Sequence, residues 1–73
     1  MSSGVILFHT TAMAMKAEKA LTREGFTVKL IPTPREFSSD CGIALRFPWS
    51  LAEAIKPVLQ GASIDVQGIQ RVR

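Results

Sequence analysis

The first third of the chain passes from an apolar run to a helical pattern. Residues 5–8 (VILF) are apolar without alternation, which is typical of a strand that is covered on both faces. The spacing then becomes helical, with apolar residues on one face and Lys16, Lys19 and Arg23 on another. Gly25 is expected to end this helix as its C′ residue.

Two alternating segments follow. Residues 26–31 and 42–47 each alternate between apolar and polar positions, as half-exposed strands do. Pro32 and Pro34 are predicted to end the first of these strands, because proline lacks the N–H that a strand ladder needs. The connection over residues 32–40 is polar and long for a hairpin. Long ordered loops in small domains are often functional.

A second helix is predicted over residues 50–60. Ser50 and Glu53 have the spacing of a capping box, in which each side chain accepts from the other residue's backbone N–H. Pro57 removes one helical hydrogen bond and is expected to kink or shorten the helix. A last strand is predicted over residues 64–72, with Gly68 at a bulge where the alternation slips.

The predicted order of elements is therefore βαββαβ. We expect an α+β fold, a ferredoxin-like two-layer sandwich with an antiparallel four-stranded sheet in the order 4-1-3-2. A chain of 73 residues has room for one domain, residues 1–73. The expected strands lie near residues 4–9, 26–31, 42–47 and 64–72, and the expected helices near 11–24 and 50–60.

This fold leaves one face of the sheet without helices. Because residues 5–8 are apolar on both faces of their strand, the open face is predicted to carry an apolar strip without cover. Exposed patches of this kind usually mark interfaces. We expect a homodimer, or a protein partner, through the open sheet face.

Composition and charge narrow the classes of partner. Hydrophobic residues make up 47% of the chain and charged residues 21%, which is typical of a globular protein. No apolar run approaches the ~18 residues that cross a bilayer, and the first residues do not have the pattern of a secretory signal, so no membrane partner is expected. The net charge of +3 is a mild excess, and residues 42–49 lack the aromatic pattern of an RNA-recognition motif. No nucleic-acid partner is expected.

Cys41 is the single cysteine and His9 the single histidine. No internal disulfide can form, and a lone thiol persists most easily in a reducing compartment, so we expect a cytoplasmic location. One cysteine and one histidine argue against a four-ligand zinc site. We expect neither a metal nor another cofactor.

The predicted topology places Cys41 beside the start of the first helix. The start of the third strand lies next to the end of the first, where His9, Thr10 and Thr11 are found. A helix N-terminus carries unpaired N–H groups and a partial positive charge, which both favour the thiolate. Since the thiolate is the reactive form of cysteine, we expect Cys41 to be a reactive thiol within reach of solvent.

Its flanks support a reactive role without excluding a structural one. Arg35 in the loop, and His9 when protonated, would favour the thiolate further, while Gly42 would leave room for the sulfur of another molecule. Residues 38–40 (SSD) make the flank of Cys41 polar. A lone cysteine is, however, often a small inert hydrophobic residue, and the residues alone leave both interpretations open.

Three segments resemble a family of small selenium/sulfur carrier-like domains. They are residues 10–21 (TTAMAMKAEKAL), residues 31–47 (IPTPREFSSDCGIALRF) and residues 64–68 (IDVQG). The resemblance covers nearly the whole chain, and the stretch from Pro32 to Gly42 is its specific part.

The resemblance implies a carrier that holds sulfur or selenium on Cys41 between a donor protein and an acceptor protein. Pro32, Pro34, Arg35 and Gly42 match the same motif. A carrier is favoured over a self-sufficient enzyme, since no Ser/His/Asp set or carboxylate pair is evident.

The main alternative is a non-catalytic protein-interaction module. The proline-rich loop and the outer face of the first helix would then bind a partner, and Cys41 would be structural.

Overall fold

The computed structural model describes residues 2–37 and 41–72 and has the predicted order of strands and helices. Its elements are β1 (Ser3–Leu7), α1 (Thr11–Arg23), β2 (Lys29–Pro32), β3 (Ile43–Pro48), the 3₁₀ turn η1 (Trp49–Leu51), α2 (Ala52–Gly61) and β4 (Gly68–Val72).

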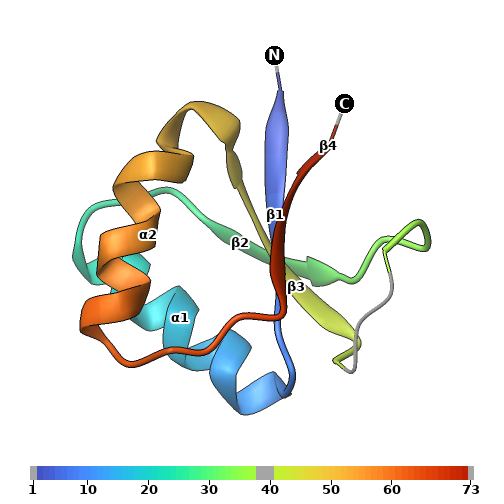
Figure 1. Ribbon diagram of the computed structural model, residues 1–73, viewed down its shortest axis with the longest axis horizontal. Helices are drawn as coiled ribbons and strands as arrows, with labels where there is room; N and C mark the ends of the chain where they lie inside the picture. The colour runs from blue at the N-terminus through green and yellow to red at the C-terminus, as the bar shows by residue number, and fades with distance from the viewer. Residues whose placement is uncertain (1, 38–40, 73) are drawn as a thin grey trace.

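The four strands form one sheet in the order β2-β3-β1-β4, and every neighbouring pair is antiparallel. Read from the other edge, this order is 4-1-3-2. Both helices lie on the same side of the sheet (Figure 1). The prediction of an α+β chain with two helices and a four-stranded antiparallel sheet is confirmed.

The first helix ends as its sequence predicts. Gly25 follows α1 with a φ of 92°. Its N–H donates to the carbonyl of Thr22, and the N–H of Phe26 donates to the carbonyl of Leu21. These two bonds form a Schellman motif, which satisfies carbonyls that the helix end would leave unpaired.

The second helix ends in the same way without a glycine in the left-handed position. Gly61 is the last helical residue, and Ser63 adopts the left-handed conformation with a φ of 56°. The N–H groups of Ser63 and Ile64 donate to the carbonyls of Gln60 and Leu59.

These helix ends shorten the strands that follow. The second strand begins at Lys29 and not at residue 26, and the fourth begins at Gly68 and not at residue 64. At residues 26 and 64 the reason is that the N–H groups of Phe26 and Ile64 are bonded to the preceding helices. Pro32 was expected to end the second strand, but it pairs with Ile43. Because β2 is an edge strand, a residue without an N–H is tolerated there.

The capping box predicted for α2 is wrong. Neither η1 nor α2 has a side-chain cap, because the 3₁₀ turn at Trp49–Leu51 leads directly into the helix. Glu53 instead accepts a hydrogen bond of 2.7 Å from Lys56 Nζ, and this cation lowers the pKa of Glu53. The helix continues through Pro57 to Gly61 and is not shortened at the proline.

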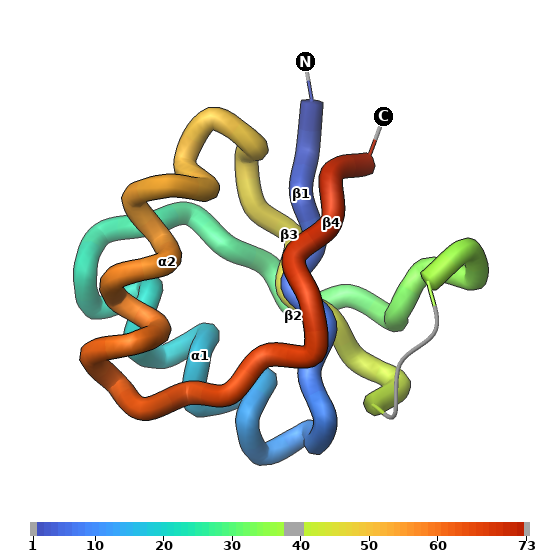
Figure 2. The backbone as a smooth tube through the Cα atoms, in the orientation of Figure 1, coloured from blue at the N-terminus to red at the C-terminus, as the bar shows by residue number. Residues whose placement is uncertain are grey.

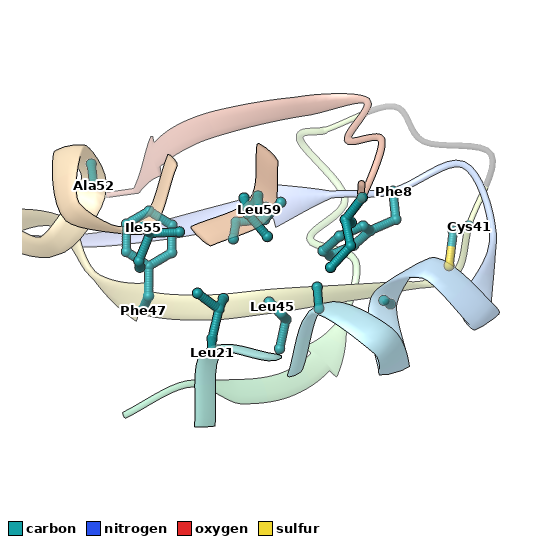
Figure 3. Close-up of a cluster of buried hydrophobic side chains, with 12 residues drawn as sticks. Phe8, Leu21, Cys41, Leu45, Phe47, Ala52, Ile55 and Leu59 are labelled. Atoms are coloured by element: carbon teal, nitrogen blue, oxygen red, sulfur yellow. The ribbon is translucent and has the colours of Figure 1, made fainter. Parts of the chain in front are cut away.

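The main core lies between the sheet and the helices (Figure 3). Ile6 and Phe8 from the first strand and its continuation face the fully buried Leu21 of α1 and Ile55 of α2. Cys41 belongs to this cluster. The buried members are Ile6, Phe8, Ala14, Ala17, Leu21, Cys41, Leu45, Phe47, Ala52, Ile55, Leu59 and Ile64.

The apolar strip on the other face of the sheet is covered, contrary to expectation. Val5, Leu7 and Ala44 have exposed fractions of 1%, 4% and 0%. Phe37, which follows β2, packs against them together with side chains of neighbouring strands. The uncovered strip from which a homodimer was expected is therefore absent from the described part of the chain.

The two Schellman motifs give opposite expectations for glycine. Ser63→Gly should raise the free energy of unfolding by about 1 kcal/mol, because a left-handed L-residue costs roughly 1–2 kcal/mol and the greater freedom of unfolded glycine offsets part of the gain. Gly25→Ala should lower the free energy of unfolding by about 1 kcal/mol through the strain of a left-handed alanine. No steric clash adds to this cost, because no atom lies within 4 Å of the added Cβ. Urea denaturation measures both, and shifts of the same sign would contradict this account.

Gly4 in β1 is required by close packing. A Cβ there would overlap the ring of Phe47 and lie 2.8 Å from Trp49 Cε3. These two rings stack with their centroids 6.0 Å apart. Gly4→Ala should therefore lower the free energy of unfolding by about 1–3 kcal/mol, as overpacking does. Gly61→Ala is the matched control, because its Cβ meets nothing within 4 Å and its stability should not fall.

Candidate functional site

Cys41 places its sulfur at the start of α1 (Figure 3). Cys41 Sγ lies 3.6 Å from Thr11 Oγ1, within the first turn of the helix, and accepts a hydrogen bond of 3.4 Å from the N–H of Ile43. The antiparallel pairing of β1 with β3 brings these parts of the chain together, because Leu7 at the end of β1 faces Ala44 near the start of β3. The structure thus brings Cys41 and Thr11 together, as the topology predicts.

The backbone of Cys41 and Gly42 is held by Thr33, a residue that the sequence analysis did not identify. Thr33 Oγ1 donates to the carbonyl of Cys41 at 2.9 Å, and Thr33 N donates to the carbonyl of Gly42 at 3.0 Å. Thr33 directly follows the pair Pro32↔Ile43. Its position would have followed from the sequence only if Pro32 had been assigned to the strand.

The sulfur is buried in this conformation. Cys41 has an exposed fraction of 4%, so the expectation of a thiol within reach of solvent is wrong here. Part of the reason is that the start of α1 lies directly against the sulfur. The polar flank that suggested exposure, residues 38–40, lies outside the described residues.

His9 and Thr10 are exposed between β1 and α1. Thr10 is the N-cap of the helix, and its Oγ1 accepts a hydrogen bond of 3.2 Å from the N–H of Met13. Its hydroxyl therefore stabilises the helix that meets the sulfur. His9 has an interaction of its own.

Gly42 leaves open space beside the cysteine, as expected. It is exposed, and a Cβ added there would meet nothing within 4 Å. An open hollow of about 250 Å³ lies next to it along the β2 edge of the sheet. The hollow is lined by Leu30, Ile31, Pro32, Gly42 and Ile43.

The remaining loop residues follow β2. The segment after β2, which contains Pro34 and Arg35, extends away from the helices (Figure 2). Its turn is closed by a hydrogen bond of 3.0 Å from Phe37 N to the carbonyl of Pro34. Among the described residues, no hydrogen bond joins Arg35 to Cys41. An effect of the Arg35 charge on the thiol stays a prediction.

The arrangement can position a sulfur atom and donate hydrogen bonds to it. The Thr11 hydroxyl and the Ile43 N–H are potential donors, and the first turn of α1 adds the positive end of the helix dipole. In residues 2–37 and 41–72, no cluster of three or more His, Cys, Asp or Glu side chains could hold a metal ion. None of the described helices has the length and apolar character needed to cross a bilayer.

A family model matches nearly the whole chain. The family model described as "Putative Se/S carrier protein-like" matches residues 3–71, a span that includes Cys41, Thr11, Thr33 and Ile43. No curated protein matches the chain. No solved structure matches it either.

Thr33→Val tests whether the Thr33 side chain holds the backbone of Cys41 in place. The variant leaves the Cys41 carbonyl without its hydrogen bond of 2.9 Å from Thr33 Oγ1. It should lower the free energy of unfolding by about 1 kcal/mol and raise the rate at which iodoacetamide alkylates native Cys41. Thr27→Val, at an exposed threonine, is the control. An alkylation rate equal to that of the control would show that Thr33 does not restrain the cysteine.

Proposed function

We propose that this chain, which belongs to the Se/S carrier protein-like family, carries a sulfur or selenium atom on Cys41 between a donor protein and an acceptor protein. The observation that carries the proposal is the placement of Cys41 Sγ between Thr11 Oγ1 and the N–H of Ile43, at the start of α1. A carrier needs a held sulfur and a route for exchange, and it needs no substrate cavity.

The transfer is an exchange at sulfur that requires no external oxidant or reductant. The Cys41 thiolate attacks the terminal sulfur of a persulfide on the donor's cysteine. A new S–S bond forms on Cys41 while the donor's S–S bond breaks, and the donor cysteine leaves as a thiolate with the electron pair of that bond. The proton lost from Cys41 is balanced by the proton that the donor thiolate takes up. A selenium atom in the terminal position follows the same course.

Thr11 is the residue best placed to assist this exchange. Its hydroxyl can donate to the sulfur when Cys41 is a thiolate, and it can accept from the sulfur when Cys41 is a thiol. The partial positive charge of the helix start also favours the anion, typically by about 0.3–1 kcal/mol. Both interactions stabilise the form of Cys41 that attacks the persulfide.

Burial of the sulfur supports a carrier that protects its cargo. With an exposed fraction of 4%, a persulfide at this position would be shielded from small thiols that would reduce it. Transfer then requires the side chain to leave Thr11 and Ile43. Hydrogen bonds to sulfur are weak, and the two contacts are 3.6 Å and 3.4 Å long. These two contacts can therefore be broken without unfolding the sheet.

We extend the proposal to the fold of the domain and to its location in the cell. We propose that residues 1–73 form one ferredoxin-like domain, supported by the βαββαβ order and the β2-β3-β1-β4 sheet. We also propose a cytoplasmic location, since a single free thiol persists in a reducing compartment. A homodimer through the open sheet face is not included, because the apolar strip there is covered.

One observation favours a second function, a protein-interaction module with a structural cysteine. Cys41 belongs to the main core cluster and is as buried as Leu7. In that case the sulfur would only fill space beneath α1, and the family's chemistry would be absent from this chain.

Transfer measured by intact mass separates the two functions. The protein is incubated with a cysteine desulfurase and L-cysteine, or with a selenocysteine lyase and selenocysteine, and is then weighed. Wild type should gain one sulfur or selenium atom, and Cys41→Ala should gain none. Thr11→Val should gain it several-fold more slowly, because the sulfur loses the hydroxyl that lies 3.6 Å away. Thr22→Val, on the exposed side of α1, is the matched control.

The opposite result has a clear signature. If wild type gains no chalcogen atom from either enzyme, and iodoacetamide alkylates Cys41 only above the unfolding midpoint, the cysteine is structural and the interaction module stands.

A further inference from the structure

The outer side of α1 carries an exposed apolar residue one helical turn from Thr11. Ala14, Ala17 and Leu21 are buried against the sheet. Met15 points the other way and has an exposed fraction of 50%. Among the described residues it is the one large hydrophobic side chain that is exposed. Exposed methionines are common on surfaces that bind other proteins, because the side chain is flexible and polarisable.

Met15 lies close to the site along the helix. It follows Thr11 by four residues, which places the two side chains on the same side of α1 and about 6 Å apart along the axis. Thr11 in turn contacts Cys41 Sγ at 3.6 Å. A protein seated over Met15 would therefore also cover the end of the helix where the sulfur lies.

Positive charge borders this methionine. Lys16, Lys19 and Arg23 are exposed on the same outer side. None of the three forms an ion pair with a carboxylate in the part of the chain that the structure describes. We name the exposed side chains of Thr11, Met15, Lys16, Lys19 and Arg23 the Met15 face. It combines one apolar side chain with three unpaired cations. Its Thr11 end lies against the buried sulfur.

We propose that the Met15 face is the surface on which the persulfide donor protein docks. The proposal rests on the proposed function, because it assumes that Cys41 receives sulfur from a protein. The donor that fits this face presents carboxylates to Lys16, Lys19 and Arg23 and an apolar pocket to Met15. Opposite charges of this kind accelerate association and fix the orientation of the two proteins. Docking so oriented brings the donor's persulfide to the Cys41 end of α1.

Other surfaces of the described chain fit this role less well. The β2 edge carries Pro32, which lacks an N–H for an added strand. On the sheet face away from the helices, the apolar strip is covered. The groove lined by Ala20, Pro57 and Gly61, which borders Arg23 at the far end of the Met15 face, lies toward the other end of α1 from Thr11.

Charge reversal on the Met15 face provides the test. The double variant Lys16→Glu/Lys19→Glu and the single variant Met15→Gln are compared with the double variant Lys29→Glu/Lys56→Glu, which has the same change in net charge. Lys29 lies on β2 and Lys56 on α2, both exposed and away from this face. The second-order rate constant for sulfur transfer from a cysteine desulfurase is measured by intact mass at several salt concentrations.

The Lys16→Glu/Lys19→Glu variant should accept sulfur at least tenfold more slowly than wild type at low salt, and Met15→Gln several-fold more slowly. The Lys29→Glu/Lys56→Glu control should stay within about twofold of wild type. Added salt should slow wild type and narrow the difference between it and the charge-reversal variant, as screening of opposite charges requires.

A second measurement separates docking from sulfur chemistry. Cys41 in each variant is also loaded with a small-molecule polysulfide, which needs no docking surface, and the rates should equal that of wild type. If wild type accepts sulfur from the desulfurase and the Met15-face variants accept it equally fast, the docking surface is refuted and the carrier function stands. If wild type accepts no sulfur from the enzyme, the proposed carrier function is itself refuted, and the docking surface with it.

Discussion

The pairing of β1 with β3 is the constraint on which the candidate site depends. Five residue pairs in antiparallel register, from Ser3↔Pro48 to Leu7↔Ala44, fix the two strands against each other. Because β1 ends at the same end of the sheet at which β3 begins, Thr11 and Cys41 lie in contact although 30 residues separate them in the sequence. Thr33 reinforces this meeting from the other side, since it ties the Cys41 carbonyl to the end of β2. Cys41 is thus held by three segments, through its sulfur by Thr11 and Ile43 and through its carbonyl by Thr33.

How much of this could be predicted depends on whether a feature is local. The helical spacing of α1, its end at Gly25 and the apolar run of the first strand were sufficient for the topology, and the topology was sufficient to place Cys41 near Thr11. The capping box at Ser50 failed because a 3₁₀ turn replaced the expected helix start. The edge position of β2, which makes Pro32 acceptable in a strand, is not visible in residues 26–31 themselves.

Burial was harder to predict than position. The sequence shows that residues 5–8 are apolar on both faces, but not that Phe37 packs against Val5 and Leu7. The same holds for Cys41, whose polar neighbours in the sequence suggested an exposed thiol. Its burial arises from contacts with α1, which lies far away in the sequence. Exposure of a side chain at a strand end depends on packing between distant segments, and the sequence alone gives no pattern for it.

The size of the side chains on the buried face of α1 connects packing to chemistry. Ala14 and Ala17 are both fully buried, and their small side chains let the helix lie close to the sheet. Larger residues at these positions would move α1 outward and lengthen the 3.6 Å contact between Thr11 Oγ1 and Cys41 Sγ. One helix therefore sets how near the hydroxyl lies to the sulfur, how well the sulfur is covered, and how the Met15 face is presented. The alanines of its inner face set the distance between Thr11 and the sulfur. The cations of its outer face would bind the protein that delivers sulfur to Cys41.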